Sequence, residues 1–153
     1  GLIDVASQLV LELTERGLPD LLALDGINHG RSRGIRVALD DVTLQGGANV
    51  AVLARANVDI IKLDKALVAQ IGPETPHPPW LDDMAALIRA PRLTVIAEGV
   101  ETLQQLHTLQ DAGLQVAQGY WFSRPLEARA VIDYYRASQD SGEDFARRPA
   151  AGR

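Results

Sequence analysis

Five short apolar segments of this chain each deliver a polar side chain that could bind a metal ion, a water molecule or a phosphate. The segments are LVLELTE (9–15), IRVALDD (35–41), VDIIKLD (58–64), LTVIAEGVE (93–101) and LQVAQG (114–119). In the same order, the polar residues are Glu12, Asp40 with Asp41, Lys62, Glu98 and Gln118. Parallel β-strands gather their polar chemistry at their carboxyl ends. If the five segments are neighbouring strands, four carboxylates, one ammonium and one amide meet at one rim. Such a cluster is costly to assemble unless a cation or an anionic ligand offsets the repulsion.

The stretches between these segments have helical patterns, so strands and helices alternate along the chain. Helices are predicted at about 18–30, 66–71, 81–90, 101–112 and 127–137, with a further short helix that ends near residue 56. Leucines recur on one face of 101–112, and Gly113 follows as a stop signal. The strand segments are nearly continuous apolar runs, which is typical of strands covered on both faces. The alternation predicts an α/β fold with about five parallel strands and flanking helices.

Length and composition indicate one globular domain. The 153 residues are 46% hydrophobic and 23% charged, as in ordinary folded proteins. The net charge of −5 argues against binding to a nucleic-acid polymer. The absence of cysteine excludes disulfides and thiolate metal sites.

No apolar run approaches the roughly 20 residues that span a bilayer, and no secretory leader is visible, so we expect a cytoplasmic protein or module. We expect the domain to occupy residues 1–137 and the aperiodic tail, 138–153, to be disordered.

Longer motifs surround the rim residues. They are ELTE (12–15), RVALDD (36–41), DIIKLD (59–64), VIAEGVET (95–102) and AQGYWFSRPL (117–126). Together they resemble the EAL family, the phosphodiesterase domains of cyclic di-GMP signalling, over about residues 8–137, and the last two motifs in this order are highly specific. The resemblance implies a partial EAL-type (β/α) TIM-like barrel. It also implies a site that hydrolyses cyclic di-GMP to pGpG with two Mg²⁺ or Mn²⁺ ions.

The resemblance implies metal ligands among the carboxylates. Glu12 is similar to a ligand of the first metal, Asp40 to the carboxylate that bridges both metals, and Asp41 to a ligand of the second metal. Glu98 resembles the acidic residue that serves the second metal and its water. Hard divalent cations prefer carboxylate oxygens, and two such ions can stabilise the attacking and leaving oxygens of an in-line displacement.

The resemblance also implies catalytic and supporting roles. Lys62 is similar to the lysine that holds and polarises the attacking water, and Gln118 to a partner of that water network, so Lys62, Glu98 and Gln118 form the catalytic set. Glu15 resembles the glutamate that stabilises the loop after the paired aspartates. No residue is assigned to substrate binding.

The chain departs from the family pattern in two ways. A complete barrel needs about 200–250 residues, whereas this chain has five strand segments and no Glu-Ala-Leu tripeptide. The stretch DDVTLQGGAN (40–49) replaces a DDFGTGYSS-type loop, and Gly46–Gly47 indicates a flexible loop. We therefore expect the isolated chain to be inactive or weak, with open edges that favour a homo-oligomer or a complementing N-terminal segment. The alternative is a non-catalytic module that binds cyclic di-GMP or another protein.

Each rim residue also has a purely structural interpretation. The acidic residues could begin or cap helices, and Lys62 could be an ion-pair partner or an edge residue. Three histidines match no motif and are expected on the surface: His29, His77 and His107. The two tryptophans, Trp80 and Trp121, are expected to pack in the core or at the rim.

Overall fold

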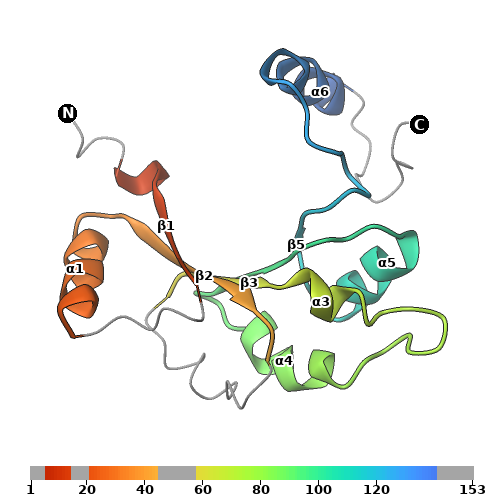
Figure 1. Cartoon of the computed structure of the whole chain (residues 1–153), viewed down its shortest axis with the longest axis horizontal. Coiled ribbons are helices and arrows are strands. Elements are labelled where there is room, and N and C mark those ends of the chain that lie inside the picture. The colour runs from red at the N-terminus through yellow and green to blue at the C-terminus, as the bar shows by residue number, and fades with distance from the viewer. Residues whose placement is uncertain (1–5, 15–20, 45–57, 141–153) are drawn as a thin grey trace.

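The five apolar segments form one parallel β-sheet (Figure 1). This computed structural model describes residues 6–14, 21–44 and 58–140. The strands are β1 (Val10–Thr14), β2 (Arg36–Val42), β3 (Ile60–Leu63), β4 (Thr94–Ala97) and β5 (Val116–Ala117). Their order in the sheet is their order in the chain, and all neighbouring pairs are parallel. The predicted α/β fold is confirmed, and within the described ranges the sheet stays open at β1 and β5.

Helices follow or connect the strands. They are α1 (Leu21–Ser32), α3 (Lys65–Val68), α4 (Trp80–Ile88), α5 (Leu103–Asp111) and α6 (Ala128–Asp140). Side chains cap two of them, because Asp64 accepts from the Ala66 N–H before α3 and Thr102 forms a capping box before α5. None of the helices in these ranges is both long enough and apolar enough to cross a bilayer.

The last helix ends three residues beyond its predicted end, whereas the division into a domain at 1–137 and a tail at 138–153 stays a prediction. Helix α6 continues to Asp140, so 138–140 are helical. The segment Ser138–Asp140 has neither proline nor glycine, so nothing in it stops the helix. Four other predictions fall outside the described residues: Glu15, the Gly46–Gly47 loop, the helix ending near residue 56 and the tail beyond residue 140.

The two faces of the sheet have different chemistry. Leu39, Ile61 and Val95 are register partners across three strands, and they belong to the buried core that includes residues of α3, α4 and α5. Successive side chains of a strand point to opposite faces. The same alternation therefore places Glu12, Asp40 and Lys62 on the face away from this core.

Helix α6 stands apart from the sheet (Figure 1). The Tyr134 hydroxyl on this helix donates to the Phe122 carbonyl at 3.1 Å. Val131, Ile132 and Tyr135 on this helix are exposed apolar side chains. The helix thus presents apolar surface that the described part of the chain does not cover.

Candidate functional site

Lys62 lies at the centre of the rim. Its Nζ atom is 2.8 Å from Asp40 Oδ1, 2.9 Å from Glu98 Oε1 and 3.3 Å from Glu12 Oε1. The lysine side chain is only 13% exposed, and those of Asp40 and Glu98 are 19% and 17% exposed, whereas that of Glu12 is 53% exposed. The structure therefore brings together side chains from β1, β2, β3 and the loop after β4.

The pKa of Lys62 reflects two opposing influences. Partial burial lowers the pKa, whereas hydrogen bonds to Asp40 and Glu98, the negative charge of Glu98 and the contact with Glu12 raise it. The second influence is larger, so the pKa of Lys62 lies above its ordinary value. The ammonium consequently stays protonated at neutral pH, where it can donate hydrogen bonds but cannot accept a proton.

An irregularity at the end of β2 allows both aspartates to reach the rim. In a regular strand, Asp40 and Asp41 would point to opposite faces. The β2–β3 register shifts between Leu39 and Val42, and Asp41 adopts a positive φ of 55°. Aspartate tolerates this left-handed conformation better than most residues, and bulges commonly redirect side chains beside functional sites.

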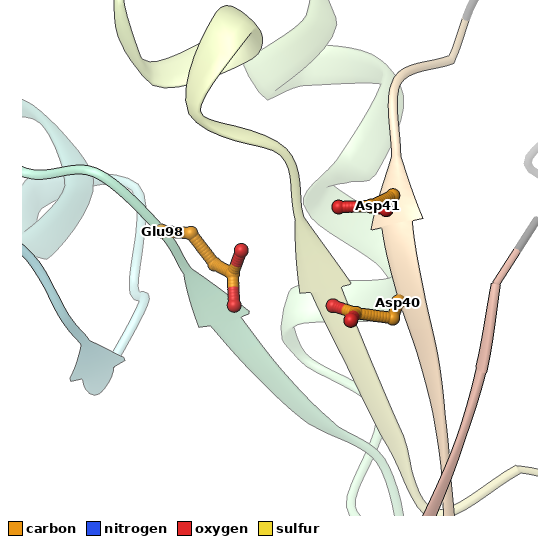
Figure 2. Close-up of side chains that lie close together, drawn as sticks. All are labelled: Asp40, Asp41 and Glu98. Carbon is orange, nitrogen blue, oxygen red and sulfur yellow. The ribbon is translucent and has the colours of Figure 1, made fainter.

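Asp40, Asp41 and Glu98 form a compact carboxylate group. Each offers one oxygen, and these oxygens lie within 4.8 Å of one another. Figure 2 shows the three carboxylates directed toward the space between the ends of β2 and β4. Glu12 is outside this group and contacts Lys62 instead.

The chemistry of this group fits a divalent cation such as Mg²⁺ or Mn²⁺. The four rim carboxylates and one ammonium have a formal sum of −3, so the lysine leaves most of the negative charge unbalanced. The Asp40 Oδ1 atom is buried, and Lys62 Nζ lies 2.8 Å from it. Hard cations bind such oxygen donors.

Gln118 completes the surroundings of Glu98. Its Nε2 group donates to Glu98 Oε1 at 2.7 Å, the same oxygen that contacts Lys62. The backbone of Gln118 is fixed because its N–H donates to the Ala97 carbonyl at 2.8 Å and its carbonyl accepts from the Val100 N–H at 3.0 Å. Protein contacts therefore converge on one oxygen of Glu98.

Among the side chains outside the rim, the tryptophans lie as predicted: Trp80 is buried, and Trp121 packs against the core. The three histidines, His29, His77 and His107, are exposed, as predicted. Sequence reasoning missed Gln105, which is buried directly behind the Glu98 loop. The Thr-x-x-Gln spacing of 102–105 was the available signal, since it is typical of a capping box.

Comparisons with known proteins agree with this geometry. The EAL domain profile matches residues 2–125. The chain is 38% identical over 120 residues to the probable cyclic di-GMP phosphodiesterase PdeN of Escherichia coli K12, and this alignment covers 78% of the chain and 23% of PdeN. It is 35% identical over 129 residues to the cyclic di-GMP phosphodiesterase PdeL of the same organism, and this alignment covers 82% of the chain and 35% of PdeL. The chain thus spans about a quarter to a third of these relatives.

Solved structures show the same fold. BlrP1 of Klebsiella pneumoniae, in a manganese and cyclic di-GMP complex, aligns with a TM-score of 0.65 and 28% identity over 81% of this chain and 34% of that one. A standalone EAL protein of Vibrio cholerae O395, in its cyclic di-GMP-bound form, aligns with a TM-score of 0.63 and 26% identity over 78% and 51%. The five parallel strands correspond to part of the TIM-barrel-like fold of these proteins. The chain therefore belongs to the EAL domain family.

Proposed function

We propose that this chain supplies one part of a metal-dependent site for the hydrolysis of cyclic di-GMP to pGpG. The observation that carries the proposal is the convergence of Asp40, Asp41 and Glu98 beside the protonated Lys62. The similarity to the cyclic di-GMP phosphodiesterase PdeL and to the probable phosphodiesterase PdeN supports it, as does the similarity to BlrP1 in its manganese and cyclic di-GMP complex.

The residues divide the work between holding cations and orienting water. Asp40, Asp41 and Glu98 would hold Mg²⁺ or Mn²⁺, with Glu12 as a more exposed ligand. Divalent ions bound there would polarise phosphate oxygens and lower the pKa of bound water. Lys62 would donate hydrogen bonds to the attacking water or a phosphate oxygen, and Gln118 would keep Glu98 in position.

We further propose that full activity needs a complementing segment or another copy of the chain. The three-carboxylate group can serve one cation well, but among the rim carboxylates of the described residues only Glu12 remains for a second. Strand β1 has one neighbour in the described sheet. Leu11 on this strand and Leu9 just before it are exposed, and α6 has an exposed apolar face. These surfaces could be covered by additional strands and helices.

The cytoplasmic location expected from the sequence stays a prediction.

A second candidate function is binding of cyclic di-GMP without hydrolysis. The observation that favours it is the position of Glu12, which contacts Lys62 and lies outside the Asp40–Asp41–Glu98 group. A site with one well-formed cation position could bind a phosphate diester through the cation and Lys62 while lacking the second metal that in-line displacement uses.

One experiment separates these functions. The chain is incubated with cyclic di-GMP and Mn²⁺, both alone and together with a complementing N-terminal EAL segment. The product pGpG is measured by chromatography, and binding is measured by calorimetry. Turnover that Glu98→Gln abolishes would support the phosphodiesterase, with the exposed Glu101→Gln as matched control. Micromolar binding without turnover would support the receptor. Absence of both signals would contradict both functions for the chain as it stands.

A further inference from the structure

Gln105 is a polar side chain inside the core. It is 8% exposed, and burial of an amide is costly unless both of its ends are hydrogen-bonded. Its Oε1 atom accepts from the N–H groups of Glu101 at 2.8 Å and Thr102 at 3.1 Å. Its Nε2 group donates to the Val68 carbonyl at 3.3 Å. The amide thus links the Glu101 and Thr102 N–H groups before α5 to the Val68 carbonyl at the end of α3, which also accepts from the Ile71 N–H at 3.0 Å.

These two helix ends belong to the segments that carry Lys62 and Glu98. Helix α3 begins three residues after Lys62, and its last residue is Val68. The loop that contains Glu98 runs into Glu101 and Thr102 before α5. Gln105 therefore connects the two segments whose side chains form the 2.9 Å ion pair between Lys62 and Glu98.

Glycines allow the same segments to touch closely. Gly99 has a φ of 72°, and a Cβ atom placed there would lie 2.5 Å from the Cβ atom of Lys65. On the other side of the loop, a Cβ atom at Gly119 would overlap the backbone of Val100. The Glu98 loop is therefore packed between α3 and the Gln118 loop, and the hydrogen bonds of Gln105 support the same segment.

We propose that Gln105 is a positioning residue, which sets the spacing between Lys62 and Glu98 and thereby the affinity of the Asp40–Asp41–Glu98 group for a divalent cation. The metal ion in this inference comes from the proposed function. The link that Gln105 makes between the two segments does not depend on that function. The amide of Gln105 hydrogen-bonds to backbone atoms of Val68, Glu101 and Thr102, so its effect passes through the backbone of 98–102 and 65–68. Residues that support metal ligands typically change metal affinity 10-fold to 100-fold when mutated.

The test uses two variants and one control on the same helix. Gln105→Met keeps the size but removes every side-chain hydrogen bond, whereas Gln105→Glu keeps the acceptor for the two N–H groups and loses the donor to Val68. Gln110→Met is the control, because Gln110 is exposed on α5. The Mn²⁺ dissociation constant is measured by calorimetry at a temperature where circular dichroism shows each variant folded.

The expected result is a roughly 10-fold or greater weakening of Mn²⁺ binding in Gln105→Met, a smaller weakening in Gln105→Glu, and no change in Gln110→Met. A lower melting temperature with an unchanged Mn²⁺ dissociation constant would show a merely structural role and overturn the proposal. If Gln105→Met does not fold, the Gln105→Glu comparison decides by the same criterion.

A second measurement separates failure of this inference from failure of the proposed function. The coupling between Lys62→Met and Glu98→Gln is measured by double-mutant unfolding cycles without metal, in the original and the Gln105→Glu backgrounds. If the unmodified chain binds no Mn²⁺, the proposed function fails, but a reduced coupling in the Gln105→Glu background still supports positioning. An unchanged coupling overturns it.

Discussion

Replacement of Lys62 by methionine tests the electrostatics of the rim most directly. Methionine has a similar length and removes only the charge and its hydrogen bonds. The ammonium contacts three carboxylates at 2.8, 2.9 and 3.3 Å, so its loss leaves these negative charges without their shared partner. We expect lower stability in the absence of metal.

The size of the effect follows from burial. Removal of one member of a fully buried ion pair costs about 3–5 kcal/mol, whereas exposed pairs contribute about 0–1 kcal/mol. Asp40 and Glu98 are mostly buried, but Glu12 is 53% exposed and belongs to the weaker class. Removal of the lysine also removes its own burial cost. We therefore expect Lys62→Met to lower the free energy of unfolding by about 2–4 kcal/mol.

The pH range of this contribution follows from the direction of the lysine pKa shift. Because the pKa of Lys62 is raised in the folded chain, its stabilising effect is fully present below the unfolded value of about 10.4. It is lost as pH rises through the folded value. Titration of Lys62 should therefore leave the difference in free energy of unfolding between the original chain and Lys62→Met unchanged between about pH 6 and 9.

The assay is urea unfolding followed by circular dichroism, with EDTA or with Mn²⁺. Lys65→Met is the control, since Lys65 is an exposed lysine three residues later. Mn²⁺ should restore more stability to Lys62→Met than it adds to the original chain, because the cation replaces the missing positive charge. A loss no larger than that of the control, or an equal response to Mn²⁺ in both proteins, would refute the reasoning.

Three further substitutions have expected outcomes. Glu98→Gln should weaken Mn²⁺ binding by at least about 10-fold in calorimetry, because it removes a charged oxygen from the carboxylate group. Gly99→Ala should lower the free energy of unfolding by about 1–3 kcal/mol, because the positive φ of Gly99 and the adjacent α3 side chain oppose a Cβ atom. Gly72→Ala is the control, because a Cβ atom at Gly72 would meet open space, and it should change the free energy of unfolding by less than about 0.5 kcal/mol. Ile61→Ala should cost about 2–5 kcal/mol in urea unfolding, since Ile61 is fully buried, whereas the exposed Ile132→Ala should cost far less.

The sequence predicted the strands and their common rim well, for a simple reason. Apolar runs such as Val37–Leu39 before Asp40 are continuous, and parallel strands in chain order bring their carboxyl ends together. The side-chain arrangement at the rim was less accessible. The register shift before Asp41 depends on its pairing with β3, and Glu12 meets Lys62 outside the carboxylate group because of its place on β1. The Gln105 link to Val68 joins residues 37 apart, so only the folded chain reveals it.

The strand order has a consequence for how copies of the chain could meet. In the described sheet, β1 and β5 are the two outer strands, and they present different edges. Parallel pairing of β5 in one copy with β1 in another is a head-to-tail contact, because each copy uses two different surfaces. Such contacts repeat, giving a ring if the rotation closes and a growing filament if it does not. Association through these edges would therefore appear in light scattering as a series of sizes that increases with concentration, and a segment that covers both edges would stop the growth.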